Sequence, residues 1–223
     1  MKPMHGRSAA TIYSEDAHRL WQRYSEGYIT AGNSLIPRLI KTKTGYIEFG
    51  ALSFSTSQLV YPIIFLYRHF IELRLKQIIL ECNDFLRVPI IKENEKTTLI
   101  FNNHKLIGLQ GDQGLWDICR NIIEELLPNE PRDELNAAEE TISYFSKMDY
   151  ESYNFRYPVD TQGNLNHSGD NASIDLTLLR ERMSELDGYL EGTIMIILGP
   201  RGMTKCVYGV ELYDPMDDID GSL

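Results

Sequence analysis

The stretch TSQLVYPIIFLYRHFIELRLKQIILE, residues 56–81, decides the fold of this 223-residue chain. When these residues are placed on a helix at about 100° per residue, the apolar side chains spread over most of its circumference. A helix that is apolar on nearly all sides is buried by its neighbours. We therefore predict a long, buried central helix over residues 56–81, in which Pro62 marks a kink or a later start.

A narrow band of charge interrupts this apolar surface, and we call it the polar stripe. It consists of Arg68, His69, Glu72 and Lys76. One interpretation is a solvent-exposed helix edge with ion pairs one turn apart. The other is a buried polar network, or a site lined by another element, in which each charge must be paired. Arg74 and Gln77 fall outside the stripe and need partners of their own.

Four further helices are expected around the central one. Hydrophobic periodicity and capping residues place them at residues 14–34, 114–127, 131–148 and 173–198. Ser173 is the expected cap of the last helix, and Gly199-Pro200 its stop. The first helix is weakened at its end by Gly32, Asn33 and Pro37. Residues 41–53 are expected to form a loop or a very short strand. Residues 205–212 are compatible with a short strand. The sequence thus predicts an all-α bundle of about five helices, with minor short strands.

The charge of the chain is unevenly distributed. The formal net charge is −10, which argues against a domain that grips nucleic acid by bulk charge alone, although a local basic cleft stays compatible with it. No basic residue follows Lys205, whereas five acidic residues do. We expect one helical domain over residues 1–204, with its core at about 56–198, and an acidic tail or appendage at 205–223.

Three widely spaced cysteines with no CxxC pair predict neither a disulfide framework nor a zinc site, and we expect no metal and no cofactor. The first residues lack the apolar core of a signal peptide, and the longest uncharged apolar run near the middle of the chain has nine residues, Leu59 to Tyr67. The sequence therefore predicts a cytoplasmic protein without membrane contact.

Two polar positions outside the central helix could carry chemistry. His104 is flanked by Asn103 and Lys105, and it reads either as a structural residue at a helix start or as a base or phosphate contact. Arg156 lies between two aromatic residues at the start of a long polar segment, 149–173. Its side chain can anchor this segment on a helix carboxylate such as Glu72, or hold a phosphate.

Three short motifs resemble the HEPN superfamily of small helical-bundle proteins. They are Tyr67-Arg68-His69-Phe70-Ile71-Glu72-Leu73-Arg74-Leu75-Lys76, Asn103-His104-Lys105-Leu106 and Phe155-Arg156-Tyr157-Pro158-Val159-Asp160. The resemblance covers roughly residues 56–198 and implies a helical bundle, commonly dimeric, of the kind found in prokaryotic toxin–antitoxin and antiviral defence systems. Many members of the superfamily are metal-independent ribonucleases. Their signature, an arginine separated by four to six residues from a histidine, is not present in this sequence.

Two hypotheses follow from this resemblance. In the first, the protein is a metal-independent ribonuclease or an RNA-binding protein. His69, His104 and Arg156 are then the catalytic candidates, and the polar network or substrate-binding residues are Arg68, Glu72, Lys76, Tyr157 and Asp160. This hypothesis expects the side chains to converge in a cleft, preferably at a dimer interface. In the second, the protein is a non-catalytic interaction module, such as an antitoxin or a defence-complex subunit. The same residues then form a saturated, buried ion network, and the acidic tail or an exposed apolar patch meets a protein partner.

Overall fold

The computed structural model describes residues 17–40, 46–48, 57–82, 100, 102–109, 111–150, 152–166 and 173–207. This part of the chain is mostly helical, as predicted, and holds five α-helices and one small sheet. In chain order the elements are α1 (Ala17–Ile40), β1 (Tyr46–Glu48), the 3-10 helix η1 (Ser57–Leu59), α2 (Val60–Cys82), α3 (Leu115–Leu126), α4 (Arg132–Met148), β2 (Ser173–Asp175) and α5 (Leu176–Val207).

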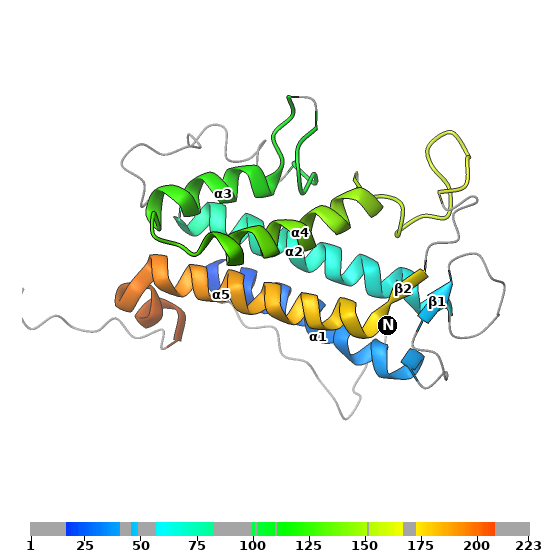
Figure 1. Ribbon diagram of the computed structural model, residues 1–223, viewed down its shortest axis with the longest axis horizontal. Helices are drawn as coiled ribbons and strands as arrows, with labels where there is room; N and C mark the ends of the chain where they lie inside the picture. The colour runs from blue at the N-terminus through cyan, green and yellow to red at the C-terminus, as the bar shows by residue number, and fades with distance from the viewer. Residues whose placement is uncertain are drawn as a thin grey trace, which may run out of the picture.

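The predicted central helix is α2, and the other helices surround it. Sixteen of its 23 residues are buried, and the other seven are of intermediate exposure, so none of its residues is fully exposed. Helices α1, α3 and α5 pack directly against it. In Figure 1, α2 runs behind α4, with α3 above it and α1 and α5 below it. Pro62 lies in the first turn of α2, where its missing N–H has no intrahelical partner to lose.

Helix α1 extends to Ile40, beyond the end predicted near residue 34. A Cβ on Gly32 would lie 2.7 Å from Cε1 of Tyr67, so this glycine lets α1 approach α2 closely. The Tyr67 hydroxyl also donates a hydrogen bond of 2.7 Å to the side-chain oxygen of Asn33. Gly32 and Asn33, which weaken the helix in isolation, therefore both lie where α1 contacts α2. The helix continues past Pro37 because tertiary packing stabilises its last turn, in which Leu39 is buried.

The start of α5 differs from the prediction. Ser173 does not cap this helix, because it lies in β2 and pairs with Glu48 of β1 in an antiparallel register. The cap is Asp175, whose Oδ1 accepts hydrogen bonds from the N–H groups of Thr177 and Leu178 at 2.9 and 3.0 Å. The pairing of β1 with β2 keeps residues 173–175 extended, so the helix starts three residues later than its sequence pattern alone suggests.

The end of α5 agrees with the prediction at Gly199 but differs from it afterwards. The backbone of Gly199 leaves the helical region with φ of 58°, which agrees with the predicted stop. The chain then turns helical again up to Val207, so the strand predicted at 205–212 is wrong for residues 205–207. Residues 208–212 lie outside the described residues, as do most of the residues of the predicted loop at 41–53. Of the latter, the described part is β1.

An ion network centred on the buried Arg74 joins α2 to α5, where its acidic partners are partly exposed. The guanidinium of Arg74 lies 2.8 Å from a carboxylate oxygen of Glu191 and 3.4 Å from one of Asp187, both on α5. On its own helix, Arg74 donates a hydrogen bond of 3.1 Å to Gln77. Gln77 in turn donates one of 2.9 Å to Glu81. The residues outside the polar stripe thus find their own partners, and a charged side chain fixes how α5 packs on α2.

Candidate functional site

The polar stripe is buried over most of its length. Arg68, Glu72 and Lys76 have relative exposures of 0%, 2% and 4%. The ion pairs one turn apart exist, with 3.0 Å from Arg68 to Glu72 and 2.8 Å from Lys76 to Glu72. The interpretation of these three residues as a solvent-exposed edge is therefore wrong. They form the buried polar network that the alternative interpretation describes.

Glu72 is the centre of this network. Its Oε1 accepts a hydrogen bond of 2.8 Å from Lys76 and lies 2.8 Å from Nδ1 of His104, while its Oε2 accepts one of 3.0 Å from Arg68. Burial by itself would raise the pKa of Glu72. The charge and hydrogen bond of Lys76, the hydrogen bond with His104 and the charge of Arg68 more than offset this and lower the pKa to about 2. Glu72 is thus a fixed, ionised acceptor at neutral pH.

Arg68 connects three segments that are distant in the sequence. Its Nε donates a hydrogen bond of 2.9 Å to the backbone oxygen of Asp149, just after α4, and its Nη2 donates one to the backbone oxygen of His104. Its Nε also lies 3.7 Å from Oδ2 of Asp149. The planar fork of a guanidinium suits this role because it directs several donors in fixed directions. Arg68 therefore positions both the His104 loop and the segment after α4.

Asp149 belongs to the candidate site, although the sequence pattern does not single it out. It is buried, and its Oδ1 accepts hydrogen bonds from the N–H groups of Tyr153 and Asn154 at 2.7 and 3.0 Å. One signal could have found it. A buried arginine carries five N–H donors, more than Glu72 can accept, so a second acidic partner was to be expected. An acid at the end of a helix, directly before the distinctive aromatic stretch, is a natural candidate.

His104 forms the exposed edge of the network. Its side chain is 50% exposed, although its Nδ1 contacts a carboxylate that is 2% exposed. Its Nε2, on the opposite side of the ring, has no hydrogen-bond partner among the described residues. The flanking residues hold the backbone in place. Asn103 donates a side-chain hydrogen bond of 2.9 Å to Gln113, and its own side-chain oxygen accepts one of 3.0 Å from the N–H of Lys105.

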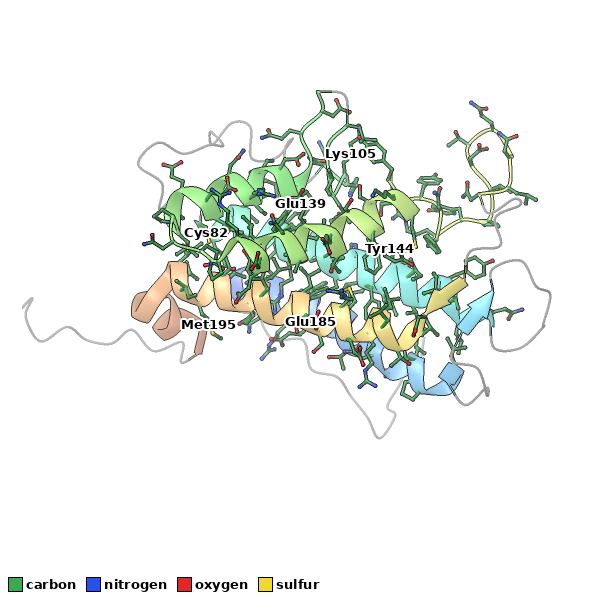
Figure 2. The ribbon with its side chains drawn as sticks, in the orientation of Figure 1. Cys82, Lys105, Glu139, Tyr144, Glu185 and Met195 are labelled. Atoms are coloured by element: carbon green, nitrogen blue, oxygen red, sulfur yellow. The ribbon has the colours of Figure 1, made fainter. Side chains whose placement is uncertain are left out.

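A tight turn joins the His104 segment to α3. Oδ2 of Asp117 accepts hydrogen bonds from the N–H groups of Gly108 and Gly114, each at 2.8 Å. A Cβ on Gly108 would lie 1.9 Å from the backbone oxygen of Asp112, so only glycine fits there. The side chain of Lys105, labelled in Figure 2 at the loop before α3, pairs with Asp112 at 2.5 Å. The described residues of the loop that carries His104 are therefore held together by hydrogen bonds and by an ion pair.

His69 lies beside the network and makes no hydrogen bond with it. Its ring stacks on Phe65 at a centroid distance of 5.7 Å and meets the ring of Tyr28 edge-on at 4.5 Å. Burial is the main cause that lowers the pKa of His69. The charge of Glu72 opposes this effect, and the positive charges of Lys76, Arg68 and Arg156 add to it. The ring is therefore packed as a neutral aromatic group between α1 and α2.

Arg156 is outside the network. Its Nε donates a hydrogen bond of 2.8 Å to the backbone oxygen of Ser152, and its guanidinium lies 5.8 Å from the ring centroids of both Tyr153 and Tyr157. The prediction that Arg156 anchors its segment on Glu72 is wrong, because the oxygens of Glu72 are occupied by Arg68, Lys76 and His104. The segment is instead anchored by Asp149, through the N–H groups described above.

Tyr157 and Asp160 belong to the same surface segment. Tyr157 is 47% exposed. Oδ1 of Asp160 accepts hydrogen bonds from the N–H groups of Gln162 and Asn164, each at 2.8 Å, and its Oδ2 accepts one of 2.9 Å from the side chain of Asn164. The side-chain and backbone hydrogen bonds with Asn164 are the main reason why the pKa of Asp160 is lowered. In this arrangement Asp160 holds its own turn closed.

In the part of the chain that the structure describes, no group of three or more histidine, cysteine or acidic side chains is arranged to hold a metal ion. None of the described helices combines the length and the apolar character needed to cross a membrane. The comparisons with protein-family models, with curated proteins and with solved structures all give no match.

Proposed function

We propose that the protein is a HEPN-like component of a prokaryotic toxin–antitoxin or antiviral defence system that cleaves RNA without a metal, with His104 as its acid–base residue. One observation carries the proposal: the half-exposed ring of His104 is oriented through Nδ1 by the buried carboxylate of Glu72. A carboxylate on one ring nitrogen fixes the orientation of the imidazole and stabilises the imidazolium that forms when the other nitrogen takes a proton.

The reaction that suits this geometry is transesterification of RNA. Nε2 of His104 removes the proton of a ribose 2′-hydroxyl, the 2′-oxygen forms a bond to the adjacent phosphorus, and the bond from phosphorus to the 5′-oxygen breaks. The 5′-oxygen leaves with a proton taken from water, and the hydroxide that remains takes the proton from the imidazolium of His104, which regenerates the base. The products are a 2′,3′-cyclic phosphate and a free 5′-hydroxyl. Arg68 and Lys76 act indirectly, because they keep Glu72 ionised and so keep His104 in position.

The test is cleavage of single-stranded RNA by the purified protein in the presence of EDTA. We expect His104→Ala to lower the rate by roughly a hundredfold or more, in line with the usual contribution of a general base. His69→Ala is the matched histidine variant, and its smaller effect would separate the packed ring from the exposed one. Arg156→Ala tests whether the third predicted catalytic residue acts at the same site. Equal background cleavage by the unmodified protein and the three variants would refute the proposed ribonuclease activity.

A second candidate function is a non-catalytic interaction module, and the saturation of Glu72 favours it. Both oxygens of this carboxylate are used by structural partners, as a scaffold would require. Two cavities of about 450 and 400 Å³ also lie between α4 and α5, and both are lined by Thr141. Figure 2 labels Tyr144 on α4 and Glu185 on α5, which border these cavities. Acidic side chains line both of them, which suits a protein partner with a basic surface.

The oligomeric state is part of the same proposal. A homodimer, as the resemblance implies, would sediment at twice the chain mass of 25.7 kDa. Sedimentation velocity over a range of concentrations measures this directly. Absence of cleavage, together with a stable complex between the protein and a basic partner protein, would favour the interaction module over the ribonuclease.

A further inference from the structure

A surface cavity lies at the segment after α4, separate from the contacts of His104. Its volume is about 380 Å³, which falls within the range of small-ligand sites. The lining comes from the first turn of α2 and from residues 154–165, namely Tyr61, Asn154, Phe155, Arg156, Tyr157, Pro158 and Leu165. The lining is therefore mainly aromatic and apolar, with a single charged side chain.

The walls of this cavity are held in place by the backbone. Asp149 fixes the segment at Tyr153 and Asn154, and an isolated bridge pairs Val159 with Leu165. The N–H of Asn166 donates a hydrogen bond of 3.1 Å to the backbone oxygen of Pro158. The cavity is thus built on a closed turn that is tied to the buried network through Asp149. A preformed site of this kind loses little entropy when a ligand binds.

Arg156 supplies the cavity with an uncompensated positive charge. Its side chain is exposed, and no described carboxylate lies within ion-pairing distance of it, whereas Arg68, Arg74 and Arg120 all have acidic partners. Its terminal guanidinium nitrogens face no described acceptor. The guanidinium lies to one side of the paired rings of Tyr153 and Tyr157. Its two terminal nitrogens are therefore available to bind an anion together, and phosphate is an anion that arginine binds well in this way.

The same segment exposes aromatic and aliphatic surface. Tyr157 is 47% and Tyr153 37% exposed, and Leu165, on the other side of the turn, is 64% exposed. The rings of Tyr153 and Tyr157 lie 4.6 Å apart, and Phe155 contacts Tyr61 at 6.3 Å. Exposed aromatic faces beside an arginine are the features with which proteins bind unstacked bases of single-stranded RNA.

We propose that this cavity binds one nucleotide unit, with its base stacked in the aromatic lining and its phosphate on Arg156. The choice of RNA as the source rests on the function proposed above, but binding is measured independently of cleavage. The site explains how a chain with a net charge of −10 can hold RNA, since stacking supplies the affinity and a single cation supplies the electrostatic contact.

The test is binding of a fluorescein-labelled, 2′-O-methylated single-stranded RNA octamer, which lacks the 2′-hydroxyl needed for cleavage. We expect Tyr157→Leu and Arg156→Gln each to raise the Kd about fivefold or more, the effect typical of losing one stacked base or one charged contact. The slope of log Kd against log salt is expected to fall by roughly 0.7 in Arg156→Gln, as for the loss of one phosphate contact on a single strand.

Matched controls come from the cavity between α4 and α5. Tyr144→Leu and Arg182→Gln make the same two changes at side chains that are similarly exposed and that line a cavity of similar size. We expect the Kd of these controls to stay within twofold of the unmodified protein. Equal losses in the controls, or no binding by the unmodified protein at millimolar concentration, would overturn the proposal.

Two further ligands identify what the cavity recognises. An octamer without bases that binds as tightly as the intact octamer would overturn the proposal, because stacking would then play no part. Binding of a free mononucleotide with the same dependence on Tyr157 and Arg156 would support the cavity and assign it to free nucleotides rather than to a strand. Cleavage that depends on His104 without this binding would refute the inference alone, and binding without cleavage would refute the ribonuclease alone.

Discussion

Nδ1 of His104 lies 2.8 Å from Oε1 of Glu72, so a half-exposed ring on a loop is held by a carboxylate buried in the central helix. This contact joins the surface of the molecule to its core. Arg68 reinforces it, because it binds both Glu72 and the backbone oxygen of His104. The position of the ring therefore depends on charges that are not themselves accessible to a substrate.

Glu72→Gln tests the importance of the network for stability. The substitution leaves Lys76 buried without a counter-charge and leaves Arg68 with Asp149 alone, and we expect the free energy of unfolding to fall by about 3–5 kcal/mol. Urea denaturation measures the change. Glu139→Gln is the control, because Glu139 pairs with Arg120 at a site where both side chains are partly exposed, and it should cost less than about 1 kcal/mol. Similar losses in the two variants would contradict a special role for Glu72.

The pKa of Glu72 predicts a loss of stability in acid. It is lowered from its ordinary value of 4.5 to about 2 in the folded protein, so the stabilisation is complete above pH 4.5 and is lost as the pH falls towards 2. This difference corresponds to roughly 3 kcal/mol. Urea denaturation at a series of pH values measures it. In Glu72→Gln the decline over this window should be shallower, and an unchanged decline would show that other carboxylates cause it.

Gly32→Ala tests the close approach of α1 to α2. A Cβ at this position would lie 2.7 Å from Cε1 of Tyr67, so we expect a loss of about 1–3 kcal/mol from overpacking. Gly27→Ala is the matched control in the same helix, because a Cβ there meets no atom within 4 Å. It should stabilise the protein by up to about 1 kcal/mol, since alanine favours a helix over glycine. Thermal unfolding distinguishes the two, and a gain in both would contradict the packing.

Asp175→Ala tests where α5 begins. The side chain of Asp175 accepts two N–H groups of the first turn, and its loss should cost about 1 kcal/mol. Ser173→Ala changes a residue of β2 and should cost less than about 0.5 kcal/mol. The free energies of unfolding of the two variants, measured by chemical denaturation, show which of the two residues caps α5. A larger effect at Ser173 would restore the cap expected from sequence.

The candidate site was only partly visible in the sequence. The polar stripe could be found because four charged or ionisable residues fall on one side of an otherwise apolar helix. Helical periodicity places them on one face but does not say what covers that face. Asp149, which lies 77 residues from Glu72 in the chain, was therefore missed. Anchoring of Arg156 on Glu72 is one of the two roles compatible with the sequence, because the sequence does not show the competing partners of that carboxylate.

The sequence by itself determined the central helix and the helical class of this protein, because helix formation and burial follow from local spacing and composition. Only the tertiary structure decided that α1 continues through Pro37, that Asp175 rather than Ser173 caps α5, and that Glu72 holds His104. Each of these depends on a partner that is remote in the chain, namely Tyr67 for α1, β1 for β2 and the loop before α3 for Glu72. The structure departs from the local conformational preference wherever such a tertiary contact stabilises the fold by more free energy than the departure costs.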